Sequence, residues 1–209
     1  MKYGMKLENL DEEEIREIGE AVGDAFFDYE FSEGQKGMNY IADTREKMRY
    51  MITAYIRAAV HSGILYTTSG NGEGYIIVNS PVHGYTKDAT SRFLKEFVSA
   101  IGIKGVFRFL VMAVKGGHAF KMDLRKSKTP YICLEVLAVR KEYQGKGYMR
   151  QLMNLLYEIQ AEENLGIYIG TDDPVKMSKY VHCGMKLVNT RICNQVFRDY
   201  ELYREPEKI

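Results

Sequence analysis

The sequence has no excess of charge of either sign. Its 209 residues contain 29 lysines and arginines against 28 acidic residues. A protein that binds nucleic acid or an anionic membrane over a broad surface carries a clear surplus of basic residues. We therefore expect neither a nucleic-acid partner nor a membrane partner, and any basic patch has to be local.

Cysteines and histidines are too few and too scattered to build a metal centre or a disulfide framework. The three cysteines, Cys133, Cys183 and Cys193, form an odd set without CxxC spacing, and the four histidines do not cluster. Zinc sites and disulfide-stabilised secreted domains both depend on such spacing. We expect no metal ion and a reducing compartment.

A hydrophobic run long enough to span a membrane is also missing. The most apolar window, residues 106–114, is interrupted by Arg108 and followed by Lys115, which leaves it far short of the ~20 apolar residues of a span. We interpret it as a segment of the core. The N-terminus turns acidic at residues 11–14, which argues against a secretory signal, so we expect a cytoplasmic protein.

The length and a hydrophobic fraction of 45% predict a single domain over residues 1–209. Apolar periodicity and capping residues predict helices after Asp11, near Asp43 or Thr44, near Asp88 or Thr90, within 106–114, after residue 147 and at Pro174. Strands are predicted at 5–7, 64–68, 75–78, 131–139, 166–170, 185–192 and 196–203. This order indicates a mixed α/β domain with a long sheet and helices on both faces.

The stretch 131–157 predicts a binding site for a phosphate group. An apolar run of strand length and an amphipathic helix flank a short loop that contains Gly145 and Gly147. Glycines there allow a tight turn whose N–H groups approach a bulky anion. The positive end of the following helix dipole and the charges of Lys146 and Arg150 favour the same ligand.

Two common nucleotide-binding motifs do not fit this loop. The dinucleotide motif GxGxxG needs a third glycine where this chain has Arg150, and the loop lies late in the chain. The loop does not match GxxxxGK[ST] either, so the sequence does not indicate a Walker-type nucleotide site.

The loop and its surroundings resemble the GNAT superfamily of acyl-CoA-dependent N-acyltransferases. The signature of that family, Arg/Gln-x-x-Gly-x-Gly/Ala, is matched by Gln144 and Gly147, whereas Met149 stands where the family has a small residue. The preceding LEVLAV, residues 134–139, resembles the strand whose backbone pairs with pantetheine. Four residues occupy the places of a later strand and helix of the family: Thr171, Tyr180, Gly184 and Met185.

The resemblance implies a GNAT-like α/β (α+β) fold: a mixed, mostly antiparallel central sheet with helices on both faces and splayed fourth and fifth strands. Residues 131–209 would form the acyl-CoA-binding core, and residues 1–130 would shape the acceptor side. The implied activity is that of an N-acetyltransferase, which moves the acetyl group of acetyl-CoA directly to a primary amine of a small molecule or peptide. The acceptor itself and the choice between monomer and homodimer stay open.

The resemblance also assigns residues to acetyl-CoA. The backbone groups expected along pantetheine belong to Leu137, Ala138 and Val139. The residues expected around the pyrophosphate are Gln144, Gly145, Lys146, Gly147, Tyr148, Met149 and Arg150. Thr171 would end the neighbouring strand, and Asp173 and Lys176 hold positions where the family often has an Asn near pantetheine. Met149 either crowds the loop or is absorbed by the core.

Two residues are candidates for proton transfer, and a backbone N–H from residues 137–139 would polarise the acetyl carbonyl. By its match to the family, Tyr180 would be the general acid that protonates the departing thiolate; otherwise its ring packs on the strand and its hydroxyl bonds a polar group. Glu135 is the only acid in an otherwise apolar strand, and alternation would put it on the same face as Leu137 and Val139. It would serve as the base, or it would pair with an Arg or Lys of a neighbouring strand and leave that role to water.

Other functions stay compatible with the sequence. One is a non-catalytic acyl-CoA-binding sensor or regulatory module, and another is a structural interaction protein that binds no CoA. The segment Asp28, Tyr29 and Glu30 would attract a cationic amine or would be a solvated loop.

Overall fold

A seven-stranded sheet forms the centre of the protein, with its strands in the order β1-β2-β3-β4-β5-β7-β6. The computed structural model describes residues 1–32 and 34–206. The strands are β1 Met5–Lys6, β2 Leu65–Thr67, β3 Gly74–Asn79, β4 Tyr131–Val139, β5 Gly166–Thr171, β6 Lys186–Asn194 and β7 Phe197–Arg204. Among the described strands only the central pair β4–β5 is parallel, and the other neighbouring pairs are antiparallel. The predicted mixed, mostly antiparallel sheet is confirmed.

In the described residues five helices match predicted ones in order, the helix expected within 106–114 is not separate, and the helix at Phe120–Lys126 was not predicted. The helices are α1 Glu12–Phe27, α2 Arg45–Ser62, α3 Lys87–Lys115, α4 Phe120–Lys126, α5 Tyr148–Glu163 and α6 Pro174–His182. Their starts obey local capping rules: Asp11 forms a capping box with Glu14, the Thr44 hydroxyl accepts from Lys47, and Asp173 precedes Pro174 as the N-cap of α6.

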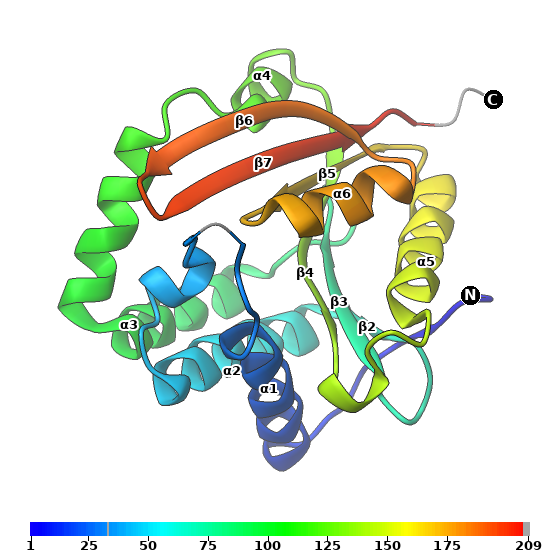
Figure 1. The fold of residues 1–209 in the computed structure, drawn as a ribbon. Helices are drawn as coiled ribbons and strands as arrows, with labels where there is room; N and C mark the ends of the chain where they lie inside the picture. The colour runs from blue at the N-terminus through cyan, green and yellow to red at the C-terminus, as the bar shows by residue number, and fades with distance from the viewer. Residues whose placement is uncertain (33, 207–209) are drawn as a thin grey trace.

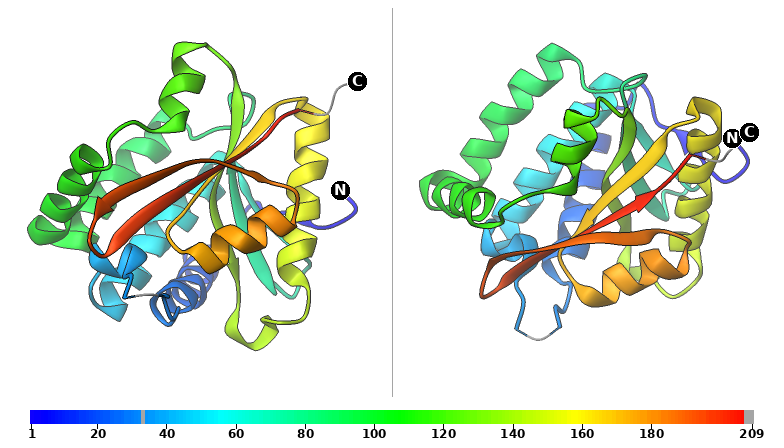
Figure 2. Two further views of the ribbon diagram at one scale, coloured as in Figure 1. Left: turned by 45° about the horizontal axis from the view of Figure 1, so that its top comes forward. Right: turned by 90° about the horizontal axis from the view of Figure 1, so that it is seen from above.

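The helices cover both faces of the sheet (Figures 1 and 2). On one face, α1 and α2 pack with Ile77, Val136 and Ala138 into the larger core. On the other face, α5 packs its leucines with Ile76 and Leu134. In the right view of Figure 2, the strands pass between α5 on one side and α1, α2 and α3 on the other.

Strands β4 and β5 pair only over their first halves. Their register runs from Tyr131 opposite Gly166 to Leu134 opposite Ile169 and then stops. Beyond this point β4 continues along β3 alone, and β5 continues along β7 alone. The predicted splay of the fourth and fifth strands is confirmed, and it leaves a seam between them that opens toward the carboxyl ends of both strands.

Helix α3 corrects the interpretation of residues 106–114 as a core segment. The helix is broken at Gly102, where φ is 65° and ψ is 178°, and it begins after Thr86 rather than at Asp88 or Thr90. In its second half Phe107 is 68% exposed and Val114 is 81% exposed. The prediction failed because hydropathy measures how apolar a segment is and not which side of it faces the protein.

Helix α3 is also much longer than the apolar window 106–114, from which we expected no segment long enough to span a membrane. By length and composition alone, Lys87–Lys115 is long and apolar enough to cross a membrane, with a mean hydropathy of 1.9 in its most apolar window.

Candidate functional site

The open seam exposes two backbone N–H groups of β4. The N–H of Arg140 donates to the carbonyl oxygen of Glu73 at 3.0 Å, so Arg140 is directed toward β3. Backbone groups alternate in direction along a strand, and Ala138 is therefore directed toward its partner Tyr75. Leu137 and Val139 point the other way, into the seam, where β5 has already diverged. Of the three backbone positions assigned to pantetheine, Ala138 is thus wrong because β3 occupies its polar groups.

The loop after β4 has the shape of an anion cradle. Gln144 donates from Nε2 to the carbonyl oxygen of Val139 at 3.1 Å, which ties the loop to the end of the strand. Gly145 and Gly147 have φ values of 77° and 89°, in the left-handed region that favours glycine. A Cβ added at either glycine would meet no other atom within 4 Å. The concave side of the loop is therefore open at both glycines.

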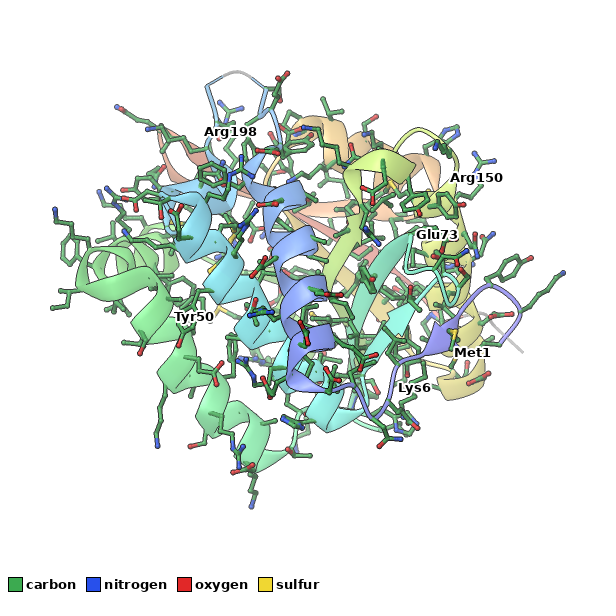
Figure 3. All side chains as sticks on the ribbon, turned by 90° about the horizontal axis from the view of Figure 1, so that it is seen from below. Met1, Lys6, Tyr50, Glu73, Arg150 and Arg198 are labelled. Carbon is green, nitrogen blue, oxygen red and sulfur yellow. The ribbon has the colours of Figure 1, made fainter. Side chains whose placement is uncertain are left out.

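Helix α5 starts at this loop without a side-chain cap. Its N-cap is Gly147, and the first helical bond runs from the N–H of Gln151 to the Gly147 carbonyl at 3.2 Å. The N–H groups of Tyr148, Met149 and Arg150 therefore have no acceptor within the helix, and such groups together with the helix dipole bind anions. Arg150 extends into solvent beside them (Figure 3), and Lys146 is exposed as well.

Met149 does not crowd the loop. Its side chain is partly buried and packs against the core between α5 and the sheet. Of the two outcomes considered for this departure from the family signature, the structure has the one in which the core absorbs the side chain, so the face of the loop beside the glycines stays open.

Tyr180 is a buried residue of α6 on the same face of the sheet as α5. Burial raises the pKa of its hydroxyl, and the carboxylate of Asp172 and the thiol of Cys183 raise it further. Within the described residues the hydroxyl has no hydrogen-bond partner. A phenol that stays protonated and is not engaged elsewhere is free to donate its proton to a ligand.

Glu135 lies on the opposite face of the sheet from the one predicted. Val78 pairs with Leu134 and Ile77 pairs with Val136, so Glu135 is the extra residue of a β-bulge. The bulge breaks the alternation of side chains along β4. Leu137 and Val139 pack toward α5, whereas the Glu135 carboxylate contacts residues on the side of α1 and α2.

Two polar side chains hold that carboxylate. Asn79 donates to Oε1 at 2.8 Å, and the hydroxyl of Tyr85 donates to Oε2 at 2.8 Å. Burial raises the pKa of Tyr85, and the charge of Glu135 and the hydrogen bond add to this effect. Neither partner is the Arg or Lys that was the alternative to a catalytic role. The Glu135 carboxylate is therefore held by two neutral donors at the point where the seam opens.

Asp173 and Lys176 join α6 to the segment that follows α1. Asp173 is fully buried, and its carboxylate accepts from the N–H of Ser32 at 2.9 Å and from the hydroxyl of Tyr29 at 3.1 Å. Burial alone would raise the pKa of Asp173, but the bonds from Ser32, Val175 and Tyr29 outweigh it and the pKa is lowered. The acid works as a cap and tether, since its oxygens are engaged within the protein.

The ammonium of Lys176 is similarly engaged. Its Nζ lies 2.8 Å from Asp172 and 4.0 Å from the ring centre of Tyr29. Thr171, the last residue of β5, is buried and paired with Tyr200 on β7. Of these three expected contacts, Thr171 borders the seam, while the charged ends of Asp173 and Lys176 are satisfied by other residues.

The segment at residues 28–30 is not a free acidic site. Asp28 lies 2.5 Å from Arg45 and 3.6 Å from Lys141, and the hydroxyl of Tyr29 is bonded to Asp173. A cavity of about 230 Å³ lies between α1 and the loop after β4; it is lined by Ala21, Asp24, Ala25, Asp28, Arg140, Lys141 and Glu142. Both of its aspartates carry arginine partners.

Asn79 and Tyr85 were missed by sequence reasoning. Asn79 is the polar end of an apolar strand, which is a weak signal. Tyr85 lies 50 residues from Glu135, in the loop before α3, and no local pattern connects the two. Among the described residues no group of three or more His, Cys, Asp or Glu is arranged to hold a metal ion.

An open seam beside an uncapped helix start is the arrangement that the GNAT resemblance implied. Residues 107–184 match the model of the acetyltransferase (GNAT) family. The resemblance to the GNAT superfamily is confirmed for this part of the chain. No curated protein sequence is significantly similar to the chain.

Solved structures share the whole fold. One is histone acetyltransferase HPA2 and related acetyltransferase from Corynebacterium glutamicum, with a TM-score of 0.57, 12% identity and coverage of 99% of this chain and 98% of that one. Another is the polyamine N-acetyltransferase of Drosophila melanogaster, with a TM-score of 0.55, 11% identity and coverage of 91% and 96%. An N-acetyltransferase from Staphylococcus aureus Mu50 has a TM-score of 0.53, 14% identity and coverage of 93% and 97%. At such identities the likeness shows the fold alone.

Proposed function

We propose that the protein is an N-acetyltransferase that moves the acetyl group of acetyl-CoA directly to a primary amine of a small molecule or peptide. The observation that carries the proposal is the meeting, at the carboxyl end of β4, of an open strand edge with an uncapped helix start. A long ligand with a pyrophosphate and an amide-bearing arm fits both features together. The similar structures include a polyamine acetyltransferase and a histone acetyltransferase, which supports an amine acceptor.

Acetyl-CoA binding is assigned to main-chain groups. The pyrophosphate would accept hydrogen bonds from N–H groups between Gly145 and Arg150, and the pantetheine arm would lie in the seam along Leu137 and Val139. In this arrangement residues 131–209 bind the donor, and residues 1–130 supply the acceptor side together with Glu135.

The chemistry needs no covalent enzyme intermediate. The lone pair of a neutral amine attacks the thioester carbonyl, whose developing oxyanion accepts a hydrogen bond from a seam N–H of Leu137 or Val139. The tetrahedral intermediate loses the surplus proton of its nitrogen to solvent, and its collapse then forms the amide and breaks the C–S bond. Tyr180 donates its phenolic proton to the departing thiolate, and solvent returns a proton to the phenolate.

Glu135 is proposed as the base that takes the proton of the incoming ammonium. The bulge directs its carboxylate to the α1–α2 side of the sheet, and the donors Asn79 and Tyr85 fix its orientation. Each carboxylate oxygen has a second lone pair, so these bonds leave room to accept a proton.

Two measurements on the purified protein test the proposal. Thermal unfolding with saturating acetyl-CoA should show a raised midpoint, because a ligand of the folded state stabilises it. Thiol release from acetyl-CoA with a panel of amines should then identify an acceptor. Stabilisation without thiol release for any amine would favour the non-catalytic sensor, and an unchanged midpoint would exclude both functions.

Tyr180→Phe tests the general acid. It should lower kcat by roughly 100-fold, the low end of general acid–base catalysis, with little change in the affinity for acetyl-CoA. Unchanged turnover would remove Tyr180 from the mechanism.

Glu135→Gln tests the base through the pH profile of kcat/KM. Without the carboxylate only the already neutral amine reacts, so the acid limb of the profile should move to higher pH. A profile identical to that of the parent would assign the proton transfer to water.

A further inference from the structure

The second half of α3 turns its most apolar stripe toward solvent. Ile103 is 90% exposed, Phe107 68%, Leu110 55% and Val114 81%. Steps of four, three and four residues separate these positions, so all four side chains lie along one face of the helix. A helix on the surface of a soluble protein presents polar side chains at such positions.

The opposite face of the same helix is the one that packs on the protein. Gly105 and Met112 are buried there, about half a helical turn away from the exposed stripe. Arg108 lies on the flank and donates to the carbonyl oxygen of Tyr40 at 3.0 Å. The helix is thus attached by a narrow side, and its broad apolar face is left uncovered.

The charged residues of this segment have one sign, although Arg108 is paired with Asp43 at 2.9 Å and leaves the lysines as the cations of the stripe that have no ion pair among the described residues. From residue 97 to residue 122 the chain contains no aspartate or glutamate, whereas it contains Lys104, Arg108, Lys115 and Lys121. Lys104 and Lys115 are exposed at the two ends of the stripe. The net charge of the whole chain is only +1, so this segment is a local basic and apolar surface.

The same charges argue against a second copy of the chain on this face. An antiparallel pair of α3 helices would bring Lys104 of one chain beside Lys115 of the other. A parallel pair would put each lysine beside its own copy. In neither arrangement does the segment offer an acid to pair with them, and like charges repel.

We infer that the outer face of α3 docks on the surface of an anionic lipid bilayer. Interfacial helices carry an apolar face with Phe and Leu and basic residues beside it, and they lie in the plane of the headgroups. The apolar stripe would enter the boundary of the acyl chains while Lys104 and Lys115 bind lipid phosphates. This replaces the expectation that the protein has no membrane partner.

The helix lies on the bilayer and does not cross it. It is broken at Gly102, and its buried face at Gly105 and Met112 is occupied by the protein. Figure 1 shows α3 along the side of the molecule opposite to α5. The docked protein therefore keeps the α5 loop open to the aqueous phase.

Vesicle sedimentation with the full chain tests the inference. Vesicles that contain phosphatidylglycerol should bind the protein, and vesicles of phosphatidylcholine alone should bind it more weakly. The triple variant Ile103→Ser, Phe107→Ser, Leu110→Ser should reduce binding to anionic vesicles by roughly 1000-fold, since each buried apolar side chain contributes about tenfold or more.

A matched control replaces three exposed apolar residues elsewhere, Val82→Ser, Leu187→Ser and Val188→Ser, and should leave vesicle binding unchanged. Circular dichroism and the thermal midpoint of both variants verify that they fold. Lys104→Gln and Lys115→Gln should each weaken binding to anionic vesicles about fivefold, the effect of one cation near an anionic leaflet.

Three outcomes would overturn the inference: no binding to either vesicle, equal loss of binding in the control variant, or equal binding to neutral and anionic vesicles. Light scattering measures the oligomeric state and so tests whether a second copy of the chain covers this face instead. A dimer that the triple serine variant dissociates, without vesicle binding, would assign the face to a second copy.

Discussion

Helix α5 and the second half of α3 carry similar apolar stripes and present them in opposite directions. In α5, Leu152, Leu155 and Leu156 are fully buried against the sheet. In α3, Phe107 and Leu110 point to solvent. An apolar stripe therefore predicts that this face of the helix will be buried against a partner. It does not predict what that partner is, because this depends on where the rest of the chain places the helix.

The N-terminal ends of the two helices also differ, because one is uncapped and the other is capped. At the start of α5, Gly147 leaves the first N–H groups uncapped and open. At the start of α3, the hydroxyl of Thr86 accepts a hydrogen bond from the N–H of Ala89 at 3.2 Å. The proposed ligand of α5 therefore binds at the N-terminus of that helix, whereas the proposed bilayer contacts the side of α3.

The largest expected effect is on stability, in Leu152→Ala. Leu152 is completely buried, and removing a buried leucine leaves a cavity, so the free energy of unfolding should fall by about 2–5 kcal/mol. Phe107→Ala in α3 should change it by about 0.5 kcal/mol or less because the ring is exposed. Urea unfolding of both variants checks the pair. Equal losses would mean that the face of α3 is covered within the protein.

Gly147→Val should have the next largest effect, on acetyl-CoA. A valine at a φ of 89° distorts the loop, and its side chain enters the open space of the anion. The dissociation constant of acetyl-CoA, measured by calorimetry, should rise by about 100-fold or more.

Gly102→Val in α3 is the matched control for Gly147→Val. Gly102 also has a positive φ and open space around its Cβ position, so its substitution strains the backbone in a similar way. It should lower the thermal midpoint and leave acetyl-CoA affinity unchanged. If the valine at position 147 also left that affinity unchanged, the anion site would lie elsewhere.

The sequence predicts best where the physical signal is local. The first residues of α1, α2 and α6 could be predicted from the N-cap residues Asp11, Thr44 and Asp173 and from Pro174, because a cap acts on backbone groups within four residues. Strand β4 was predicted with its bounds because an apolar run of strand length leaves few alternatives.

The errors arise where distant parts of the chain meet. The bulge at Glu135 depends on the register between β3 and β4, so strict alternation put the carboxylate on the wrong face. Asn79 and Tyr85 reach it from 56 and 50 residues away. The core assignment of α3 failed for a related reason: its stripe has no partner within the described part of the chain.

The smallest expected effect is on acetyl-CoA binding, and it compares the loss of one positive charge from α5 with the loss of one from α3. Arg150 is exposed beside the uncapped start of α5, and a mobile cation there adds about 1 kcal/mol to the binding of a phosphate at most, because solvent and salt screen it. Arg150→Gln should weaken acetyl-CoA binding no more than about fivefold, and the loss should shrink as salt is added. Lys95→Gln, an exposed position on α3, should leave acetyl-CoA binding unchanged at every salt concentration. A loss of the same size in Lys95→Gln would show that the overall charge of the protein attracts the ligand, whereas a loss confined to Arg150→Gln assigns the attraction to the start of α5.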